Sequence, residues 1–353
     1  MPGVGTDRPT LLPTRWRAAV GDYANALAWS PDGALLAVAS IDGPVTLFDA
    51  GTGEAREKLP GHGFGTAALS WGPDGVLATA GQDGKVRLWD TEGGREKAAL
   101  DGGAPWVEKV EYAPDGRFIV SAAGRRLRMW RPDGELLWES TEHGSTVADV
   151  RWRPGTSKSL VSAAYGGLTL WRPDGPRAVR GFGWKGSTLV VAWSPDGRFI
   201  ATGDQDATVH FWVAKSGKDL QMYGYPTKVR ELAWSPDSRY LATGGGPDVT
   251  VWDCSGKGPA GTTPIQLSAH EELVGALAYQ NEGPLLASAG QDGLVILWEP
   301  GRRTNPVALE SPGSAVTHLA FSPDDSRLAA GCEDGGVTVF DAPDGDEAVR
   351  SRP

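Results

Sequence analysis

Histidine, cysteine and carboxylate side chains are the groups in this chain that could carry acid–base, nucleophilic or metal chemistry, and their spacing favours none of these. The five histidines are scattered between His62 and His318. The sequence contains no His-Glu-x-x-His helix, Gly-Lys-Ser/Thr phosphate loop or Gly-x-Ser-x-Gly elbow. Cys254 and Cys332 stand alone, so the sequence indicates neither a disulfide framework nor a thiolate metal site. We therefore expect no catalytic residues, no cofactor and no bound metal.

The aspartates that recur along the chain are interpreted as turn residues and not as catalytic groups. A Pro-Asp dipeptide follows an aromatic residue at several places, and a carboxylate that catalysis needs once would not recur in this way. Aspartate in such a turn accepts hydrogen bonds from the backbone just after it. The recurring residues are Asp32, Asp74, Asp115, Asp196, Asp237 and Asp324.

Aromatic residues divide the chain into eight repeats of about 41 residues. One aromatic residue ends the first apolar run of each repeat: Trp29, Trp71, Tyr112, Trp152, Trp193, Trp234, Tyr279 and Phe321. A second closes the third run: Phe48, Trp89, Trp130, Trp171, Trp212, Trp252, Trp298 and Phe340. Such a period indicates stacked units, none of which can bury its apolar face alone.

Within each repeat, three runs alternate between apolar and polar or small residues, which is typical of β-strands. In the second repeat they are 66–71, 76–80 and 85–89, separated by Pro-Asp-Gly and Gln-Asp-Gly turns. A looser fourth run follows at 96–100. Four antiparallel strands per repeat predict small twisted sheets that pack around an axis, as in a β-propeller.

Two repeats carry motifs of a known family. Gly61-His62 precedes Leu-Ala-Thr-Ala-Gly-Gln-Asp-Gly at 77–84 and Val-Arg-Leu-Trp-Asp at 86–90. His270 precedes Leu-Ala-Ser-Ala-Gly-Gln-Asp-Gly at 286–293 and Val-Ile-Leu-Trp at 295–298. In these motifs the chain resembles the WD-repeat (WD40) β-propellers, and the resemblance covers about residues 14–341.

The resemblance implies a hydrogen-bonded tetrad within a blade, made of a loop His, a strand Ser or Thr, a turn Asp and the strand Trp. Carried over residue by residue, it is complete in the second and seventh repeats: His62, Thr79, Asp83 and Trp89; His270, Ser288, Asp292 and Trp298. The histidine position holds His143 in the fourth repeat, Trp184 in the fifth and Tyr225 in the sixth. Trp184 and Tyr225 are interpreted mainly as packing residues.

Eight repeats predict an eight-bladed propeller of four-stranded antiparallel blades, with seven blades, the commoner number in the family, as the alternative. We expect one propeller over residues 14–341, between a disordered N-terminal tail (1–13) and a C-terminal tail (342–353). The expected blades are 22–60, 61–101, 102–141, 142–181, 182–224, 225–268, 269–310 and 311–341. Residues 14–20 are expected to close the last blade as its outer strand, with 346–351 as the alternative.

Charge and hydropathy limit the partners. The formal net charge of −10 argues against nucleic-acid binding, which needs a basic surface. No run of apolar residues is long enough for a membrane span, and the N-terminus lacks the apolar stretch of a signal peptide. We expect a soluble, cytoplasmic protein, and the Arg-, Ala-, Gly- and Pro-rich composition looks bacterial.

One region departs from the acidic balance. Between Arg117 and Lys185 there are twelve Lys or Arg residues against six Asp or Glu residues. Two interpretations remain open: a solvated outer edge, or a basic stripe that docks an acidic partner. The stripe would consist of Arg125, Arg126, Arg128, Arg151 and Arg153.

Loops that depart from the repeat are the best candidates for function, because specificity in repeat proteins lies in such decoration. By the geometry that the resemblance implies, they open on one rim. We expect a non-enzymatic scaffold or adaptor that binds protein or peptide partners on this rim and at the channel mouth. The aromatic residues Tyr23, Phe64 and Trp106 either form an interface hot spot together or fold down over their own blades. The predicted rim is Tyr23, Phe64, Trp106, Lys228, Arg230, Glu271, Glu272, Gln82, Gln205, Gln291 and Glu333.

The alternative function is an enzyme, or a binder of a small ligand or metal, that uses the axial channel. It requires polar side chains from several first strands to converge on the axis. Those available are Glu108, Glu111, Asp149, Arg151, Glu231 and His318.

Overall fold

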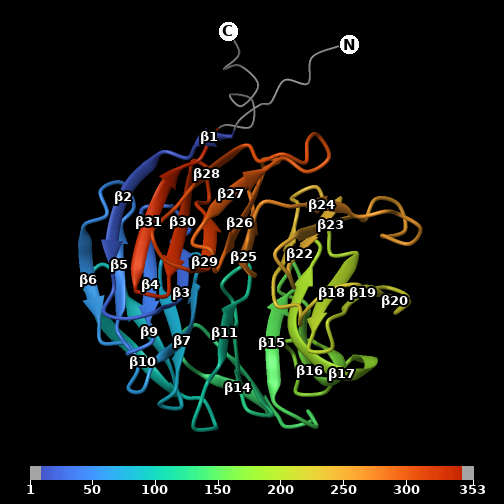
Figure 1. Ribbon diagram of the computed structural model, residues 1–353. Coiled ribbons are helices and arrows are strands. Elements are labelled where there is room, and N and C mark those ends of the chain that lie inside the picture. Colours follow the sequence, from blue (N-terminus) through green and yellow to red (C-terminus); the bar gives the residue numbers. More distant parts are fainter. Residues whose placement is uncertain (1–8, 344–353) are drawn as a thin grey trace, which may run out of the picture.

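The computed structural model describes residues 9–343, which form short, mainly antiparallel sheets around a central axis (Figure 1). Every regular element in this part of the chain is a β-strand, so the predicted all-β class is confirmed. No helix in the described residues is long and apolar enough to cross a membrane.

The first three repeats each form one four-stranded sheet. Repeat one contributes β3 (Ala24–Trp29), β4 (Leu35–Ser40), β5 (Val45–Asp49) and β6 (Ala55–Leu59). Repeat two contributes β7 (Thr66–Trp71), β8 (Leu77–Gly81), β9 (Lys85–Asp90) and β10 (Arg95–Asp101). Repeat three contributes β11 (Lys109–Tyr112), β12 (Ile119–Ala123), β13 (Arg126–Trp130) and β14 (Leu136–Ser140).

The last three repeats are similar, and two of them gain a strand from the N-terminal segment. Repeat six contributes β21 (Leu232–Trp234), β22 (Tyr240–Thr243), β23 (Val249–Asp253) and β24 (Ile265–Leu267). Repeat seven contributes β25 (Val274–Tyr279), β26 (Leu286–Gly290), β27 (Val295–Trp298) and β28 (Ala308–Glu310), with β1 (Thr10–Leu11) added outside. Repeat eight contributes β29 (Val316–Phe321), β30 (Arg327–Cys332) and β31 (Gly336–Asp341), with β2 (Thr14–Ala19) added outside.

Repeats four and five share one six-stranded sheet. Its strands are β15 (Val147–Trp152), β16 (Leu160–Trp171), β17 (Arg180–Trp193), β18 (Phe199–Asp204), β19 (Val209–Val213) and β20 (Asp219–Met222). β16 folds back on itself: its first half pairs with β15 and its second half with β17, and the Ser162 hydroxyl donates to the carbonyl oxygen of Thr169 at 3.4 Å. β17 pairs with β16 through its first half and with β18 through its second half.

Residues 9–343 therefore form seven separate sheets, and the prediction of eight separate four-stranded blades is wrong. The seven-bladed alternative matches the number of sheets, although no repeat is lost. The joint between repeats four and five is a backbone pairing of Tyr165 with Ser187. Tyr165 occupies the position of the turn aspartate, and Gly166 and Gly167 next to it adopt φ values of 98° and 114°. Around the axis the innermost strands contact one another in a closed ring: β3, β7, β11, β15, β17, β21, β25 and β29.

The core lies between the faces of neighbouring sheets. Leu47 and Leu59 of repeat one pack in one cluster with Leu77 and Trp89 of repeat two, and all four side chains are almost fully buried. Comparable clusters join the other neighbours around the ring. Each sheet thus buries its apolar faces only because the next sheet is present.

The N-terminal segment holds the ring together. β2 pairs antiparallel with β31, and Trp16 donates its indole N–H to the carbonyl of Ala50 at 3.0 Å. β1 runs parallel to β28, and Leu12 is buried in the core of repeats seven and eight. The predicted disordered tail over 1–13 is therefore wrong for Thr10–Leu12, because these residues gain backbone pairing and a buried apolar side chain. Residues 1–8 and the alternative closing segment 346–351 lie outside the described residues.

Candidate functional site

In repeat two, four side chains tie the loop before the innermost strand, here called the approach loop, to the sheet. His62 Nδ1 lies 2.7 Å from Asp83 Oδ1, and Nε2 lies 2.7 Å from Thr79 Oγ1. Trp89 donates its indole N–H to the same Thr79 oxygen at 2.9 Å. Burial lowers the pKa of His62, so the imidazole is neutral. Because the Asp83 carboxylate can only accept, Nδ1–H donates to it and Nε2 accepts from Thr79.

Repeat seven contains the second complete network. His270 Nδ1 lies 2.9 Å from Asp292 Oδ2, and Nε2 lies 2.7 Å from Ser288 Oγ. Trp298 donates to Ser288 Oγ at 2.7 Å. The Asp292 carboxylate also accepts the backbone N–H of Glu271 at 3.0 Å, which extends the network into the approach loop. The structure thus brings together all four residues of each tetrad that the resemblance implied.

Repeat four keeps half of this network. His143 Nε2 and the indole nitrogen of Trp171 both lie 2.7 Å from Ser162 Oγ. Tyr165 replaces the aspartate, and His143 Nδ1 is buried without a hydrogen-bond partner among the described residues. The approach loop of repeat four is therefore tied by fewer bonds.

Repeats five and six replace the histidine by different means. In repeat six, the Tyr225 hydroxyl lies 2.9 Å from Thr243 Oγ1 and accepts the indole N–H of Trp252 at 2.9 Å. Tyr225 thereby makes the link that histidine makes elsewhere, which the interpretation as mainly packing missed. In repeat five, the ring of Trp184 lies 3.8 Å from that of His210. The signal for Tyr225 was present in the sequence, since Thr243 and Trp252 keep their positions.

Asp204 is a buried carboxylate that the sequence analysis did not single out. Its side chain is fully buried, accepts a hydrogen bond from Thr202 at 3.3 Å and leaves Oδ1 without a partner in the described chain. Burial raises its pKa to about 7, and the charge of Asp206 adds to this. The signal was a second aspartate where repeat two has Gly81.

The residue before each turn aspartate is bound to the approach loop of its own repeat. Gln82 donates its backbone N–H to the Gly65 carbonyl at 3.0 Å. Gln205, Gln291 and Glu333 donate equivalent bonds of 2.9 Å to the carbonyls of Ser187, Leu273 and Ala315. Approach loops and aspartate turns therefore lie at the same end of the sheets, here called the rim. Gln205, Gln291 and Glu333 are exposed there, and Gln82 is half-buried.

The three predicted rim aromatics do not behave alike. Phe64 is 84% exposed and Trp106 is 58% exposed, whereas Tyr23 is half-buried. Burial raises the pKa of Tyr23, and Glu333 of repeat eight contributes to the shift. Ile41, which the sequence analysis did not single out, is 43% exposed and donates its backbone N–H to the Tyr23 carbonyl at 3.0 Å. The exposed apolar side chains of the first three approach loops and turns are thus Ile41, Phe64 and Trp106.

The charged rim residues lie on two other repeats. Lys228 and Arg230 are exposed on either side of Val229, whose side chain is buried. Glu271 and Glu272 are exposed directly after His270. The rim therefore presents cations on repeat six and anions on repeat seven.

Four charged side chains meet on the innermost strands β11 and β15. Lys109 Nζ lies 3.6 Å from Asp149 Oδ1, while Arg151 lies 3.5 Å from Asp149 and 3.9 Å from Glu111. Glu111 also accepts the backbone N–H of Trp152 at 2.9 Å, and Asp149 that of Val191 at 3.1 Å. Burial raises the pKa of Glu111 to about 7. These carboxylates therefore join neighbouring strands.

The other channel candidates stand apart from this cluster. Burial raises the pKa of Glu231 to about 7 and lowers that of His318 to about 4. His318 Nδ1 lies 3.1 Å from Thr317 Oγ1, and no ion pair joins Glu108 to another residue between 9 and 343. Within the same span, no three His, Cys, Asp or Glu side chains are grouped as metal ligands.

The predicted basic stripe is divided between separate places. Arg126 and Arg128 of β13 both bind Glu139 at 2.6 Å, and Arg151 is part of the cluster on the innermost strands. Arg153 lies 5.9 Å from the ring centre of Trp193. Arg125 is exposed beside Arg126. The five residues do not form one exposed stripe, because three of them pair with carboxylates of two different sheets and Arg153 packs on an indole ring.

Two protein-family models match segments that cover most of the repeats. Residues 16–64 match the family model of the anaphase-promoting complex subunit 4 WD40 domain. Five segments match the model of the WD domain, G-beta repeat: 53–90, 182–213, 217–253, 261–299 and 306–341.

Two curated relatives and one solved structure are similar to the chain. WD repeat-containing protein 1 of Rattus norvegicus and of Mus musculus are 38% and 37% identical over 68 residues. These alignments cover 18% of this chain and 11% of each relative, so the chain matches only a small part of their length. The crystal structure of the computationally designed Ika8 protein has a TM-score of 0.80 at 22% identity, covering 95% of this chain and 100% of that one. This last likeness is one of fold.

Proposed function

Because the chain belongs to the WD-repeat family of β-propellers, we propose that it is a non-enzymatic scaffold whose rim binds a protein or peptide partner. WD-repeat propellers generally bind protein partners, and the exposed aromatic residues on neighbouring approach loops carry the proposal for this chain. Phe64 and Trp106 expose large apolar side chains to water, which has no benefit for folding. Aromatic anchors of this kind dominate the energetics of protein interfaces.

The loop that carries Phe64 is held in place before any partner arrives. His62, two residues earlier, is bound to Asp83 and Thr79, and Gly65, one residue later, accepts the N–H of Gln82. Phe64 itself has a φ of 71°, a left-handed conformation that is unfavourable for a side chain of this size. A loop that is already ordered loses less entropy when it binds, so its aromatic side chain contributes more to affinity.

The second complete tetrad supports a second contact on the same rim. His270 is bound to Asp292, which also accepts the N–H of Glu271, so Glu271 and Glu272 project from an ordered loop. Two exposed carboxylates favour a partner with basic groups at this position. We therefore propose an apolar contact on repeats two and three and an electrostatic contact on repeat seven.

The apolar contact is tested by truncating Phe64 and Trp106 together to alanine. The tagged double variant and the tagged parent are used to capture partners from the cells of origin, and the captured proteins are quantified by mass spectrometry. The proposal expects one partner to be retained at stoichiometric amounts by the parent and to be depleted at least tenfold by the double variant.

Leu136→Ala is the matched control, because Leu136 is exposed at the start of β14, at the sheet end opposite the rim. It should retain the partner fully, and both proteins should have the melting temperature of the parent. Equal capture by F64A/W106A and by the parent would rule out the rim.

A small-ligand or metal site on the innermost strands is the rival function. The cluster of Lys109, Glu111, Asp149 and Arg151 is the observation that favours it. Against it, the cations and carboxylates balance one another, and both carboxylates already accept backbone N–H groups. Elemental analysis of the purified protein that finds one metal ion per chain would support the rival.

We propose the cytoplasm as the compartment. Cys254 and Cys332 are both buried free thiols, which suits a reducing environment. Burial raises the pKa of both thiols to about 12, so neither has thiolate character at neutral pH. Cell fractionation checks the compartment.

A further inference from the structure

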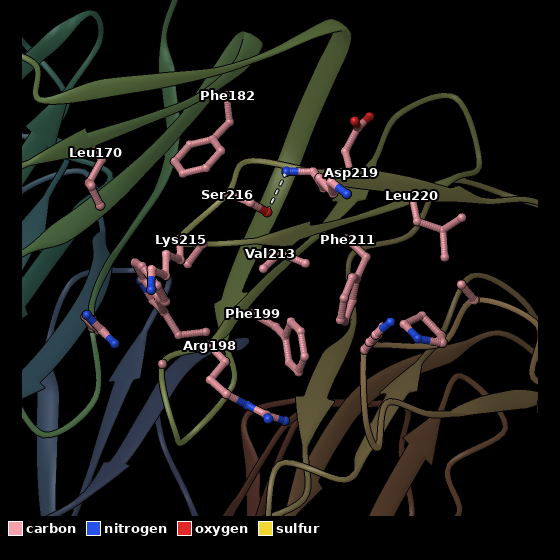
Figure 2. Close-up of a pocket in the computed structure, with 18 of the residues that line it drawn as sticks. Leu170, Phe182, Arg198, Phe199, Phe211, Val213, Lys215, Ser216, Asp219 and Leu220 are labelled. Atoms are coloured by element: carbon pink, nitrogen blue, oxygen red, sulfur yellow. Dashed lines mark hydrogen bonds between the residues drawn. The ribbon is translucent and has the colours of Figure 1, made fainter.

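A cavity of about 850 Å³ lies away from the rim, between the outer parts of repeats four, five and six (Figure 2). The paired strands β16 and β17 contribute Leu170 and Phe182, and β18 and β19 contribute Phe199, Phe211 and Val213. In Figure 2, Leu170 and Phe182 lie on one side of Val213, and Phe211 and Leu220 lie on the other. This volume is in the range of pockets that hold small organic ligands.

Aromatic rings make the walls of the cavity apolar. Phe182, Phe199 and Phe211 are each no more than 4% exposed, so only parts of their rings face the cavity. The ring centres of Phe199 and Phe211 lie 4.7 Å apart. Such walls favour a ligand with a flat or extended hydrocarbon body.

The long loop between β23 and β24 supplies one wall. Gly258 has a φ of 109°, and a Cβ at that position would lie 2.7 Å from Cε1 of Phe211. The loop backbone therefore rests on the Phe211 ring, which only glycine permits. Lys257 next to it is exposed at the cavity.

Cations surround the mouth. Five positively charged residues and one negatively charged residue, Asp219, line the cavity, although the whole chain has a net charge of −10. Arg198 is paired with Asp196 at 2.6 Å. The other four form no ion pair with any residue between 9 and 343: Arg153, Lys215, Lys218 and Lys257.

The turn that carries two of these lysines is built to stay in place. Arg180 of β17 donates to the backbone carbonyls of Lys215 and Ser216 at 2.9 and 2.7 Å. The Ser216 hydroxyl accepts the N–H of Lys218 at 3.2 Å, as the dashed line in Figure 2 marks. Lys215 and Lys218 are therefore anchored at their backbones while their ammonium groups remain available.

We propose that this cavity binds an amphiphilic organic anion, with its apolar body against Phe182, Phe199 and Phe211 and its anionic head among Lys215, Lys218 and Lys257. The apolar walls supply affinity, and the unpaired cations at the mouth select a carboxylate or phosphate head over a neutral one. The site is independent of the rim and of the partner proposed for it.

Isothermal titration calorimetry with defined amphiphiles tests the proposal. Decanoate and decyl phosphate are titrated as the two possible anionic heads, and decanamide as the neutral analogue. We expect one binding site per chain for at least one of the anions and at least tenfold weaker binding of decanamide. The anion with the lower dissociation constant identifies the head group.

Two variants locate the binding. K215E/K218E/K257E reverses the charge of the mouth and should weaken the anion at least tenfold without affecting decanamide. Leu220→Trp fills the cavity from β20 and should abolish binding of both. K58E/K85E/K97E on repeats one and two makes the same change in net charge, and Leu136→Trp adds the same indole elsewhere; both should bind like the parent.

Three results would overturn the proposal: no saturable binding of either anion, equal anion affinity in the charge-reversed variant, or equal affinity in Leu220→Trp. A peptide that combines apolar and acidic residues is titrated in parallel. Lysine-dependent binding of that peptide without binding of the amphiphiles would also overturn it and assign the cavity to a protein segment. Melting temperatures of all variants without ligand verify that each is folded.

Discussion

Repeats two and seven differ from repeats four and five in how the polar side chains of the sheet are satisfied. In the first pair, His62 and His270 each use both ring nitrogens, and the approach loop is tied to a separate four-stranded sheet. In the second pair, one nitrogen of His143 and both of His210 lack hydrogen-bond partners among the described residues, and the two repeats share a sheet. The turn aspartate thus completes the hydrogen-bond network in repeats two and seven, whereas repeats four and five are joined by the pairing of Tyr165 with Ser187.

The comparison also separates two kinds of surface. The rim residues that follow a complete tetrad project from loops with few alternative conformations, as Phe64 and Glu271 do. The joined pair of repeats instead lines, together with the long loop of repeat six, the cavity with cations at its mouth. Ordered loops suit recognition of a large partner, and a gap between sheets suits a small ligand.

Removal of a complete network should have the largest effect. His62→Ala loses two buried hydrogen bonds and leaves a cavity, and we expect it to reduce the free energy of unfolding by about 3 kcal/mol. His143→Ala loses one such bond and should cost about 2 kcal/mol. Chemical denaturation of both variants measures the difference, and equal losses would contradict the distinction between the two pairs of repeats.

The buried carboxylate of repeat five should make stability depend on pH. The pKa of Asp204 is about 7 in the folded protein and 3.8 as its ordinary value, so the folded state binds more protons between these values. The free energy of unfolding should therefore decrease as the pH rises from about 4 to about 7. In Asp204→Asn this decrease should be smaller by about 2 kcal/mol.

Thermal melts across this pH range check the prediction. Asp206→Asn removes the neighbouring charge that raises the pKa of Asp204. It should move the fall to lower pH without abolishing it. A profile of Asp204→Asn that is parallel to the parent would show that Asp204 is not its source.

The histidines of repeats two and seven should contribute with the opposite sign below about pH 6.5, and so partly offset the fall that Asp204 causes in that range. Burial lowers the pKa of His62 and His270, so the unfolded state binds protons more readily. Their contribution is present above about pH 6.5 and decreases as the pH falls below it.

Restoring the missing aspartate should make repeat four more like repeat two. Tyr165→Asp offers an acceptor to His143 Nδ1, and we expect it to stabilise the protein by about 1 kcal/mol. The gain should vanish in the His143→Ala background, which a double-mutant cycle measures. A gain that persists without His143 would show that the new aspartate acts elsewhere.

The smallest expected effect concerns Phe64. Phe64→Gly relieves the left-handed backbone at a φ of 71° and should stabilise the protein by about 0.5 kcal/mol, even though it removes the proposed anchor. Denaturation and partner capture on the same variant should therefore change in opposite directions. A destabilised variant would indicate that the exposed ring packs on its neighbours.

The sequence predicted those features that lie at constant offsets from the aromatic residues. The strands, the turns and both tetrads follow from such offsets, because the antiparallel register places residues at a given offset in the same position of each sheet. Tyr165 is the counter-example: its backbone pairing with Ser187 joins two repeats that lie side by side, and no pattern within one repeat contains that information.

The repeat pattern also could not predict how the rim side chains are oriented. Tyr23 and Phe64 occupy similar places before their first strands, yet one is half-buried and the other 84% exposed. The difference arises from contacts with repeat eight, which is distant in sequence. The cavity is likewise lined by residues of three repeats, so no motif within one repeat predicted it.

The pairing of β2 with β31 has a consequence for synthesis on the ribosome. β2 must wait without its partner until β31 has been made, roughly 320 residues later, so the ring cannot close before then. During this time β31, the strand with which β2 pairs, has not yet been synthesised, so the sheets of the nascent chain form an open stack. Loss of residues 9–20 from the finished protein would expose the edges of β28 and β31 together, and two such edges could pair with those of another copy.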